Sequence, residues 1–380
     1  MKNSTTLPMT CMAMTCMTMV LLLMPGCARY QPMPLAEQHD LVPDLTQVIE
    51  AVPPGTVNLE DGLDMAEAAI IAASLNPDLR AARMKRNVAQ AEAFAAGLLP
   101  DPQLSGSVDR PTGNVPGLIN GYSGGLSFDL RSLLTRGTDK AAAVDKARGI
   151  DLDILWQEWQ VIQQARSLAV QKHYDAERLK LLKQITALNR DYQKHSEKSL
   201  AAGDITLEQA SSDLAALMDA ESQLRDQQRS SLQTEQDLNA LMGLAPGAAV
   251  TLSALPAPAI PTDNEVEEAL ATLPARRPDL TALQSAYKSQ EESLYGVVLR
   301  QFPSISIGFN RARDTSNVQT AGLGVTIDLP IFNGSRGDIA VQSATREQLY
   351  AEYQARLDQA HTEVFKLWRQ TQMIDRKSVV

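Results

Sequence analysis

A run of about sixty residues without proline, roughly Asp139 to Ala201, constrains this 380-residue chain most. Proline inside a helix removes a backbone hydrogen bond and clashes with the preceding turn, so its absence permits one continuous helix here. At about 1.5 Å per residue that helix is on the order of 90 Å long. A helix of this length cannot be buried in a single globular domain.

The residues after this run predict that the helix turns back on itself. Within the run, apolar residues recur at heptad-like intervals, which is typical of a coiled-coil seam: Tyr174, Leu181, Ile185, Leu188 and Tyr192. In "AAGDIT" (Ala201 to Thr206), Gly203 is suited to ending one helix, and Asp204 or Thr206 to capping the next. A second leucine-rich helix then runs to "GLAPG" (Gly243 to Gly247). We therefore expect an antiparallel helical hairpin whose tip is formed by Gly203, Asp204, Ile205, Thr206 and Leu207.

The chain contains an internal repeat. "NPDLRAA" (Asn76 to Ala82) resembles "RPDLTAL" (Arg277 to Leu283), and "GLSFDL" (Gly125 to Leu130) resembles "GVTIDL" (Gly324 to Leu329). The two members of each pair are about 200 residues apart, and the elements follow in the same order. A duplication explains this better than chance. Each unit reads as helix, strand, loop, strand and long helix.

Each repeat carries a β-hairpin with one apolar and one polar face. In the second hairpin Ile305, Ile307, Phe309, Val325 and Ile327 alternate with Ser306, Asp328 and other small or polar residues. The first hairpin is less regular, with Leu126, Phe128 and Leu130 opposite Ser127 and Asp129. Strands of about ten residues with this alternation suit a transmembrane barrel, although a half-buried hairpin in a soluble sheet alternates in the same way. The long helices favour the membrane interpretation.

The N-terminus has the pattern of an export signal. Lys2 precedes the apolar run "MVLLLM" (Met19 to Met24), which is too short to span a bilayer, and Gly26 stands before Cys27. This pattern resembles a lipoprotein cleavage site, which would make Cys27 the lipidated first residue of the mature protein; the alternative is an ordinary signal peptide cut nearby. No later segment has eighteen consecutive apolar residues, so we expect no transmembrane helix.

Charge and reactive residues argue against several other functions. The net charge of −10 without basic clusters makes nucleic acid an unsuitable partner. No cysteine follows Cys27, and the four histidines are far apart in sequence, so we expect neither a zinc site nor another cofactor. "GYSGG" (Gly121 to Gly125) matches a nucleophile elbow in letters, but a strand follows Ser123 instead of the required helix. We therefore expect a protein that is not an enzyme.

Several motifs together resemble the TolC-like outer-membrane efflux family. They are "LPARRPDL" (Leu273 to Leu280), "QFPSISIGF" (Gln301 to Phe309), "DLPIFNGSRG" (Asp328 to Gly337) and "SLAAGDITLEQA" (Ser199 to Ala210). With the repeat, they cover nearly everything after residue 59. "GLLPDPQLS" (Gly97 to Ser105) and "REQLYAEYQARL" (Arg346 to Leu357) are most similar to the heavy-metal branch of that family.

The resemblance implies a mainly α fold with membrane β structure. Each protomer would give four strands and two long coiled-coil helical hairpins to a homotrimer, which would form a 12-stranded outer-membrane β-barrel and a periplasmic α-helical tunnel. The protein would be the passive exit duct of a tripartite efflux system, docking a periplasmic adaptor that connects it to an inner-membrane transporter. Asp129, Ser306 and Asp328 would face the lumen, while Ile305, Ile307, Phe309, Val325 and Ile327 would face outer-membrane lipid. Metal ions, drugs and peptides all remain open as substrates.

The expected organisation follows from these assignments. Residues 1–26 are the signal peptide, 27–58 an extended N-terminal segment, 59–247 the first repeat, 248–263 a proline-rich linker and 264–380 the second repeat. The second repeat reads as truncated before its helical tip. The alternative function is a lipid-anchored periplasmic adaptor, which would also be exported and carry a long helical hairpin, but would show one such hairpin between two small β halves.

Overall fold

The computed structural model describes residues 30–60, 62–112, 116–255 and 259–378. It divides into residues 1–41 and residues 42–380. In the first unit, residues 30–41 form neither helix nor strand. The predicted signal peptide and Cys27 lie outside the described residues.

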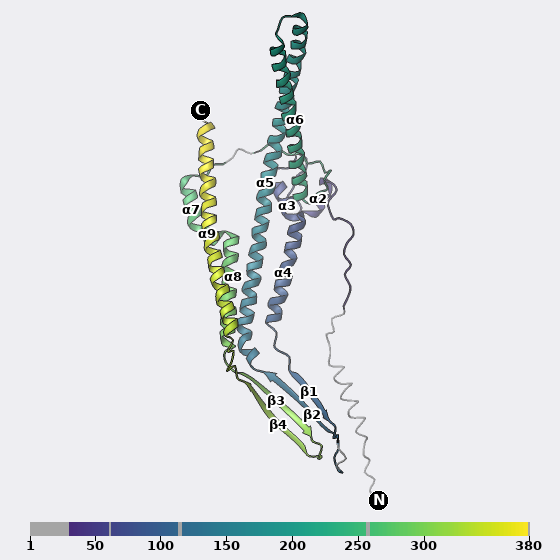
Figure 1. Cartoon of the computed structure of the whole chain (residues 1–380), viewed down its shortest axis with the longest axis vertical. Helices are drawn as coiled ribbons and strands as arrows, with labels where there is room; N and C mark the ends of the chain where they lie inside the picture. The colour runs from purple at the N-terminus through teal and green to yellow at the C-terminus, as the bar shows by residue number, and fades with distance from the viewer. Residues whose placement is uncertain (1–29, 61, 113–115, 256–258, 379–380) are drawn as a thin grey trace. The chain divides into compact units, whose positions relative to one another are not determined.

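Helices make up most of the second unit (Figure 1). The first four are α2 (Leu45–Ala51), α3 (Met65–Leu75), α4 (Pro77–Ala96) and α5 (Arg131–Ala202). The others are α6 (Leu207–Leu241), α7 (Asp263–Arg276), α8 (Pro278–Leu299) and α9 (Arg336–Ser378). The segment 27–58, expected to be extended, therefore contains the short helix α2.

Local signals explain where the helices of the two repeats begin. Pro77 and Pro278 are the first residues of α4 and α8, a position where the missing N–H is not needed. Asp64 with Glu67 and Thr262 with Glu265 form capping boxes at α3 and α7. A helix pair, two strands and a long helix thus follow one another twice, as the sequence repeat predicts.

The four strands form one antiparallel sheet in the order β1-β2-β3-β4. They are β1 (Gln103–Asp109), β2 (Gly121–Asp129), β3 (Ser304–Arg313) and β4 (Gln319–Asp328). The sheet combines both repeats, because β2 pairs with β3. The prediction of about ten residues per strand holds for β3 and β4, but β1 has seven residues. Leu130 lies just beyond β2, so its place in the alternating pattern was wrong.

Helix α5 is longer than the sequence indicates. It has 72 residues and begins at Arg131, directly after β2, instead of near Asp139. Gly137, which weakens helix propensity, lies inside it. Its length is roughly 108 Å at the ordinary helical rise. The helix therefore connects the sheet at its first residue to the α5–α6 turn at its last.

The coiled-coil seam inside the α5–α6 hairpin differs from the predicted one. Tyr174, Leu181, Ile185, Leu188 and Tyr192 are all exposed, with exposed fractions of 47–66%. Over the same stretch, the buried positions of α5 are offset by one residue, and three of the four are polar; they are Asp175, Leu182, Thr186 and Gln193. Opposite them α6 buries Ala210, Ala220, Gln227 and Thr234. The hairpin thus buries a mixture of small, polar and apolar side chains, and the predicted stripe lies outside it.

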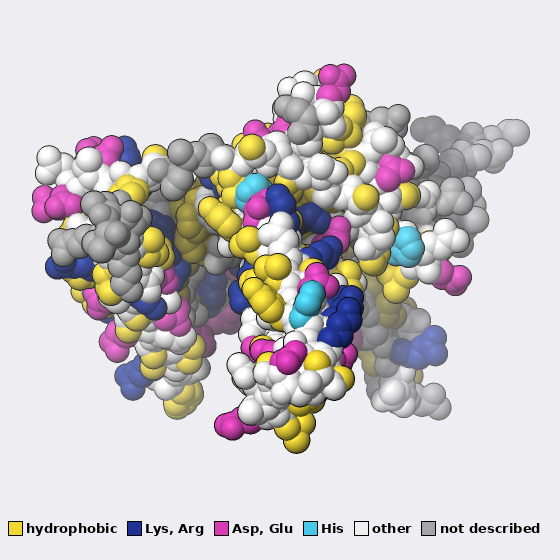
Figure 2. All heavy atoms as spheres, turned by 90° about the horizontal axis from the view of Figure 1, so that it is seen from above, with side chains coloured by type: hydrophobic (Ala, Val, Ile, Leu, Met, Phe, Trp, Pro, Cys, Tyr) yellow, Lys and Arg dark blue, Asp and Glu magenta, His cyan; other side chains and the backbone are white. Residues whose placement is uncertain are grey.

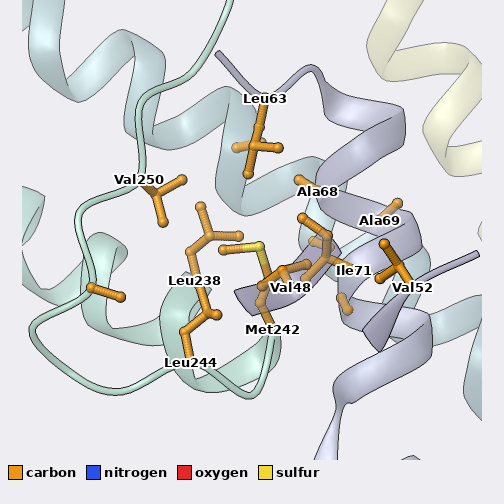
Figure 3. Packing of buried hydrophobic residues seen from close by; sticks show 14 residues of the cluster. Val48, Val52, Leu63, Ala68, Ala69, Ile71, Leu238, Met242, Leu244 and Val250 are labelled. Atoms are coloured by element: carbon orange, nitrogen blue, oxygen red, sulfur yellow. The ribbon is translucent and has the colours of Figure 1, made fainter. Parts of the chain in front are cut away.

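Two apolar clusters stabilise the helices. The larger joins α2, α3 and the end of α6, with Val48, Ile71, Leu238 and Met242 at its centre (Figure 3). Ala248 and Val250 are also buried in it, so part of the expected linker 248–263 belongs to the core. The smaller cluster joins α7, α8 and α9 through Leu273, Leu280 and Ala360.

Among the described residues, no helix is both long and apolar enough to cross a bilayer.

Candidate functional site

The register of the sheet separates two chemically different faces. Cross-strand partners lie on the same face, so residues that are paired across the strands, called a row below, all belong to one face of the sheet. One face is polar or small throughout; its rows include Ser105, Gly125, Asn310 and Gly322, and next to them Gln103, Ser127, Gly308 and Gly324. Ser107 and Ser123 also lie on this face, with their hydroxyl oxygens 2.9 Å apart. Ser123 is thus a strand residue and not a nucleophile on a strand-to-helix turn.

The opposite face is apolar over the half of the sheet nearest the helices. One row joins Leu104, Leu126, Phe309 and Leu323, and the next joins Phe128, Ile307 and Val325, followed by Ile305 and Ile327. The side chains of Ile305, Ile307, Phe309, Val325 and Ile327 are 41–64% exposed. All five predicted lipid-facing residues therefore lie on one face, and no described residue covers that face.

The three predicted lumen residues share the polar face. Asp129 pairs in register with Ser306, and Asp328 pairs with Ser304 in the adjacent row. Both carboxylates also have local partners: Asp129 accepts a hydrogen bond from the Arg131 amide at 3.0 Å, and Asp328 accepts one from the Ser304 hydroxyl at 2.6 Å. These contacts hold the two carboxylates where strand gives way to helix or loop.

The tip has the predicted turn, and of the two predicted caps Thr206 is the one used. Gly203 adopts φ +80°, and its N–H and that of Asp204 close the last turn of α5 on Leu200 and Ser199 at 3.0 and 2.9 Å. Thr206, not Asp204, caps α6 by accepting a hydrogen bond from the Gln209 amide. Leu207 is 70% exposed, whereas Ile205 is half-buried. The tip thus presents one large apolar side chain fully to its surroundings.

Apolar side chains are also exposed along the helices. Besides the stripe on α5 already described, α6 exposes Leu214, Met218 and Leu232. Figure 2, viewed from above, shows hydrophobic side chains at the surface among acidic and basic ones. Sequence periodicity identified the α5 stripe as a contact surface, but it assigned the wrong partner, because the returning helix does not cover it.

An ionic cluster that sequence reasoning missed joins the two repeats. Asp279 on α8 accepts hydrogen bonds from Arg277 at 3.0 Å and from Arg356 on α9 at 2.6 Å. Glu363 binds the same two arginines at 2.8 and 3.3 Å. Both guanidinium groups stack on Trp156 of α5, at 4.7 and 5.5 Å from its ring centre. The "RRPDL" motif signalled a helix start but gave no indication of these distant partners.

The positive charges of this cluster favour the ionised form of the Glu363 side chain. Partial burial raises the pKa of Glu363, but hydrogen bonds and charges from Arg277 and Arg356 lower it more, and the net pKa lies below its ordinary value. Within the part of the chain that the structure describes, no three His, Cys, Asp or Glu side chains gather as a metal site would require. The cluster is therefore a structural connection between α5, α8 and α9.

Comparison with known proteins supports the fold. No protein-family model and no curated protein matches the chain. Among solved structures, CusC, described in terms of folding and transmembrane channel formation, is 16% identical over 94% of this chain and 85% of its own, with a TM-score of 0.62. The outer-membrane protein VceC of Vibrio cholerae is 17% identical, covering 82% of this chain and 80% of its own, with a TM-score of 0.66.

A third solved structure agrees with these two. The MtrE outer-membrane channel of Neisseria gonorrhoeae, in its open state, is 18% identical over 92% of this chain and 82% of its own, with a TM-score of 0.58. Identities this low carry information about the fold only. The chain therefore has the TolC-like channel fold, mainly helical with one small antiparallel sheet, that its sequence motifs predict.

Proposed function

We propose that this protein is the outer-membrane exit duct of a tripartite efflux system. Three copies form a channel whose twelve strands cross the outer membrane and whose helices form a periplasmic tunnel. Substrates pass through it passively, delivered by a periplasmic adaptor and an inner-membrane transporter. The observation that carries this proposal is the four-stranded sheet with an uncovered apolar face and an opposite face of polar or small residues.

The two-faced sheet fits a barrel wall. An apolar face turned to lipid is stable in a bilayer, while the face lined by Ser, Gly, Asn and Asp suits a water-filled lumen. One copy cannot form this wall alone, because the outer edges of β1 and β4 have no partner strand in the sheet. Open edges are not tolerated in the hydrocarbon region, since each unpaired backbone group costs several kcal/mol there. Three copies joined edge to edge would remove every open edge.

The helices support the same assembly. The apolar stripe on α5, from Tyr174 to Tyr192, is too large and too regular to be left in water. A neighbouring protomer would cover it in a closed tunnel of packed helices. The exposed Leu207 and the half-buried Ile205 at the α5–α6 turn would then remain available to contact the adaptor.

The alternative of a periplasmic adaptor is less well supported. An adaptor would have one helical hairpin between two β halves, whereas here β2 of the first repeat pairs with β3 of the second. CusC is described in terms of transmembrane channel formation, and MtrE is an outer-membrane channel. Cys27 remains a proposed lipid anchor. Mass spectrometry of the mature N-terminal peptide tests whether Cys27 carries a lipid, and an unmodified Cys27 argues against the anchor.

Reconstitution tests the duct directly. The purified full chain, added to planar bilayers, should form trimers and give stepwise ion conductance. In cells that lack their own exit duct, expression with the matching adaptor and pump should restore resistance to the exported compounds. A protein that stays monomeric, never enters bilayers and gives no conductance would contradict the proposal.

A further inference from the structure

Two arginines interrupt the apolar face of the sheet at the end away from the helices. Arg311 and Arg313 lie two and four residues after Phe309 on β3. Because side chains alternate between the faces of a strand, they belong to the same, apolar face. The row of Arg311 is otherwise small, with Gly106, Gly124 and Ala321, and the row of Arg313 contains Val108, Tyr122 and Gln319. Because β3 is an inner strand, a neighbouring copy joined at the sheet edges would not cover these side chains.

Neither arginine has an acidic partner. Within the described residues no ion pair involves Arg311 or Arg313. Of the nearby carboxylates, Asp109 lies on the opposite face by parity, and Asp314 accepts hydrogen bonds from the Ser316 and Val318 amides in the β3–β4 turn. Two positive charges on this surface are therefore left without a counter-charge from the protein.

Arg313 is held in place but not satisfied. Its guanidinium stacks on the Tyr122 ring at 4.4 Å and donates a hydrogen bond to the Asn120 carbonyl at 3.3 Å. Its Nε is buried and has no hydrogen-bond partner. Because this Nε is buried, an external ligand would meet the rest of the guanidinium group and not this atom. Arg311, two residues away on the same face, is exposed.

The position of the arginines matches the level of lipid headgroups. Strand β3 has ten residues from Ser304 to Arg313. That length is about 30 Å along the strand, or about 23 Å across the membrane at a barrel-like tilt of about 40°. The outward apolar band of such barrels is about 25 Å tall and ends in aromatic residues. With Leu329, Ile331 and Phe332 exposed just beyond the other end, Tyr122 and Arg313 fall at the outer boundary of the band.

We propose that Arg311 and Arg313 form a binding site for the phosphate groups of an anionic lipid headgroup in the membrane leaflet farther from the helices. This inference rests on the proposed function, because it requires the sheet to stand in a membrane. Guanidinium groups bind phosphate oxygens through paired hydrogen bonds, and a phosphate supplies the counter-charge that both arginines lack. The small residues around Arg311 leave room for a headgroup to approach the strand.

The site can be tested with one lipid in two forms. The purified, delipidated full chain is mixed with a diphosphorylated glucosamine-based lipid or with the same lipid without phosphates, and bound lipid is counted by native mass spectrometry. The wild-type protein should prefer the phosphorylated form by about tenfold or more, and Arg311→Gln with Arg313→Gln should remove the preference. Arg336→Gln, an exposed arginine at the helix end of the sheet, is the matched control and should keep it. The corresponding lysine variants should retain part of it, since they keep the charge.

Three results would overturn the inference. The double glutamine variant could insert into vesicles normally and still prefer the phosphorylated lipid. Inorganic phosphate alone could bind the arginines as tightly as the lipid does, which would make the site one for free phosphate. Finally, the wild-type protein could fail to enter vesicles at all, which would remove the proposed function together with this site. Vesicle insertion, scored by protease protection, distinguishes the last result from the first two.

Discussion

At the scale of single residues, Asp279 shows how one position of the repeat acquired a new role. Asp78 and Asp279 are equivalent in "NPDL" and "RPDL", and both lie in the first turn of a helix. Asp78 is exposed, whereas Asp279 is 8% exposed and binds two arginines. The same side chain therefore favours a helix N-terminus in one repeat and joins three helices in the other.

Substitution of Asp279 should separate these roles. Asp279→Ala removes charged hydrogen bonds to two partly buried guanidinium groups and leaves Glu363 as their remaining carboxylate partner, so we expect a loss of about 1.5–3 kcal/mol in unfolding free energy. Asp78→Ala removes only a favourable charge near a helix N-terminus and should cost about 0.3–1 kcal/mol. Chemical denaturation of the purified variants measures both losses. Equal losses would mean that the ionic cluster adds nothing to stability.

The lowered pKa of Glu363 predicts a pH dependence. Because its folded-state pKa lies below the ordinary value of 4.5, Glu363 contributes stability that is present above that pH and lost as pH falls through the folded-state pKa. Glu363→Gln should therefore lower the unfolding temperature at neutral pH, and the difference from wild type should shrink below pH 4.5. A difference that stays constant on acidification would assign the effect to packing and not to charge.

At the scale of elements, the α5 stripe and the α5–α6 seam lie side by side in sequence. Leu181 is 58% exposed and Leu182 is 7% exposed, so neighbouring leucines serve different partners. Leu182→Ala should destabilise the hairpin itself by about 2–5 kcal/mol because it opens a cavity. Leu181→Glu should leave helix content unchanged but reduce the fraction of trimer. Circular dichroism and sedimentation measure the two properties, and a fully trimeric Leu181→Glu would show that the stripe is not a subunit contact.

The two faces of β3 allow a matched comparison of adjacent residues. Ile307→Arg places a charge on the apolar face, which costs roughly 2–4 kcal/mol at the middle of a membrane barrel and should block insertion. Ser306→Arg places the same charge on the polar face, beside Asp129, and should insert well. Membrane fractionation followed by protease protection distinguishes them. Similar insertion of both variants would favour a hairpin that never contacts lipid.

At the scale of the whole molecule, the tip connects the proposed duct to its partners. Gly203 has φ +80° and open space around its α-carbon, so Gly203→Val is disfavoured by backbone strain alone, by about 1–2 kcal/mol. Leu207→Asp changes only the exposed surface. We expect both variants to lose efflux resistance while trimer content and barrel insertion stay normal.

Crosslinking provides the control for this prediction. The sequence has no cysteine after Cys27, so a cysteine placed at Ile205 reports its own contacts. It should crosslink to the adaptor in cells, whereas a cysteine at Leu232, exposed on α6 but distant in sequence from the turn, should not. Normal resistance in both tip variants would remove the tip as the docking site.

The sequence by itself determined the elements that depend on local chemistry. Proline spacing, Gly203 and the alternation in β3 and β4 predicted the long helices, the tight turn and the two-faced hairpins, because each depends on backbone geometry or on a short period. The duplication also predicted that the elements recur in the same order. The TolC-like fold followed from these features together with the motifs.

Only the tertiary structure decided which surfaces meet. It buried Asp175, Leu182 and Thr186 in the hairpin and left the predicted apolar stripe outside, because the sides on which α5 and α6 face each other are set by the packed pair and not by the heptad pattern of α5 alone. It also joined Asp279 to Arg356, and Arg356 to Trp156, because contacts between residues far apart in sequence arise only when the helices are assembled.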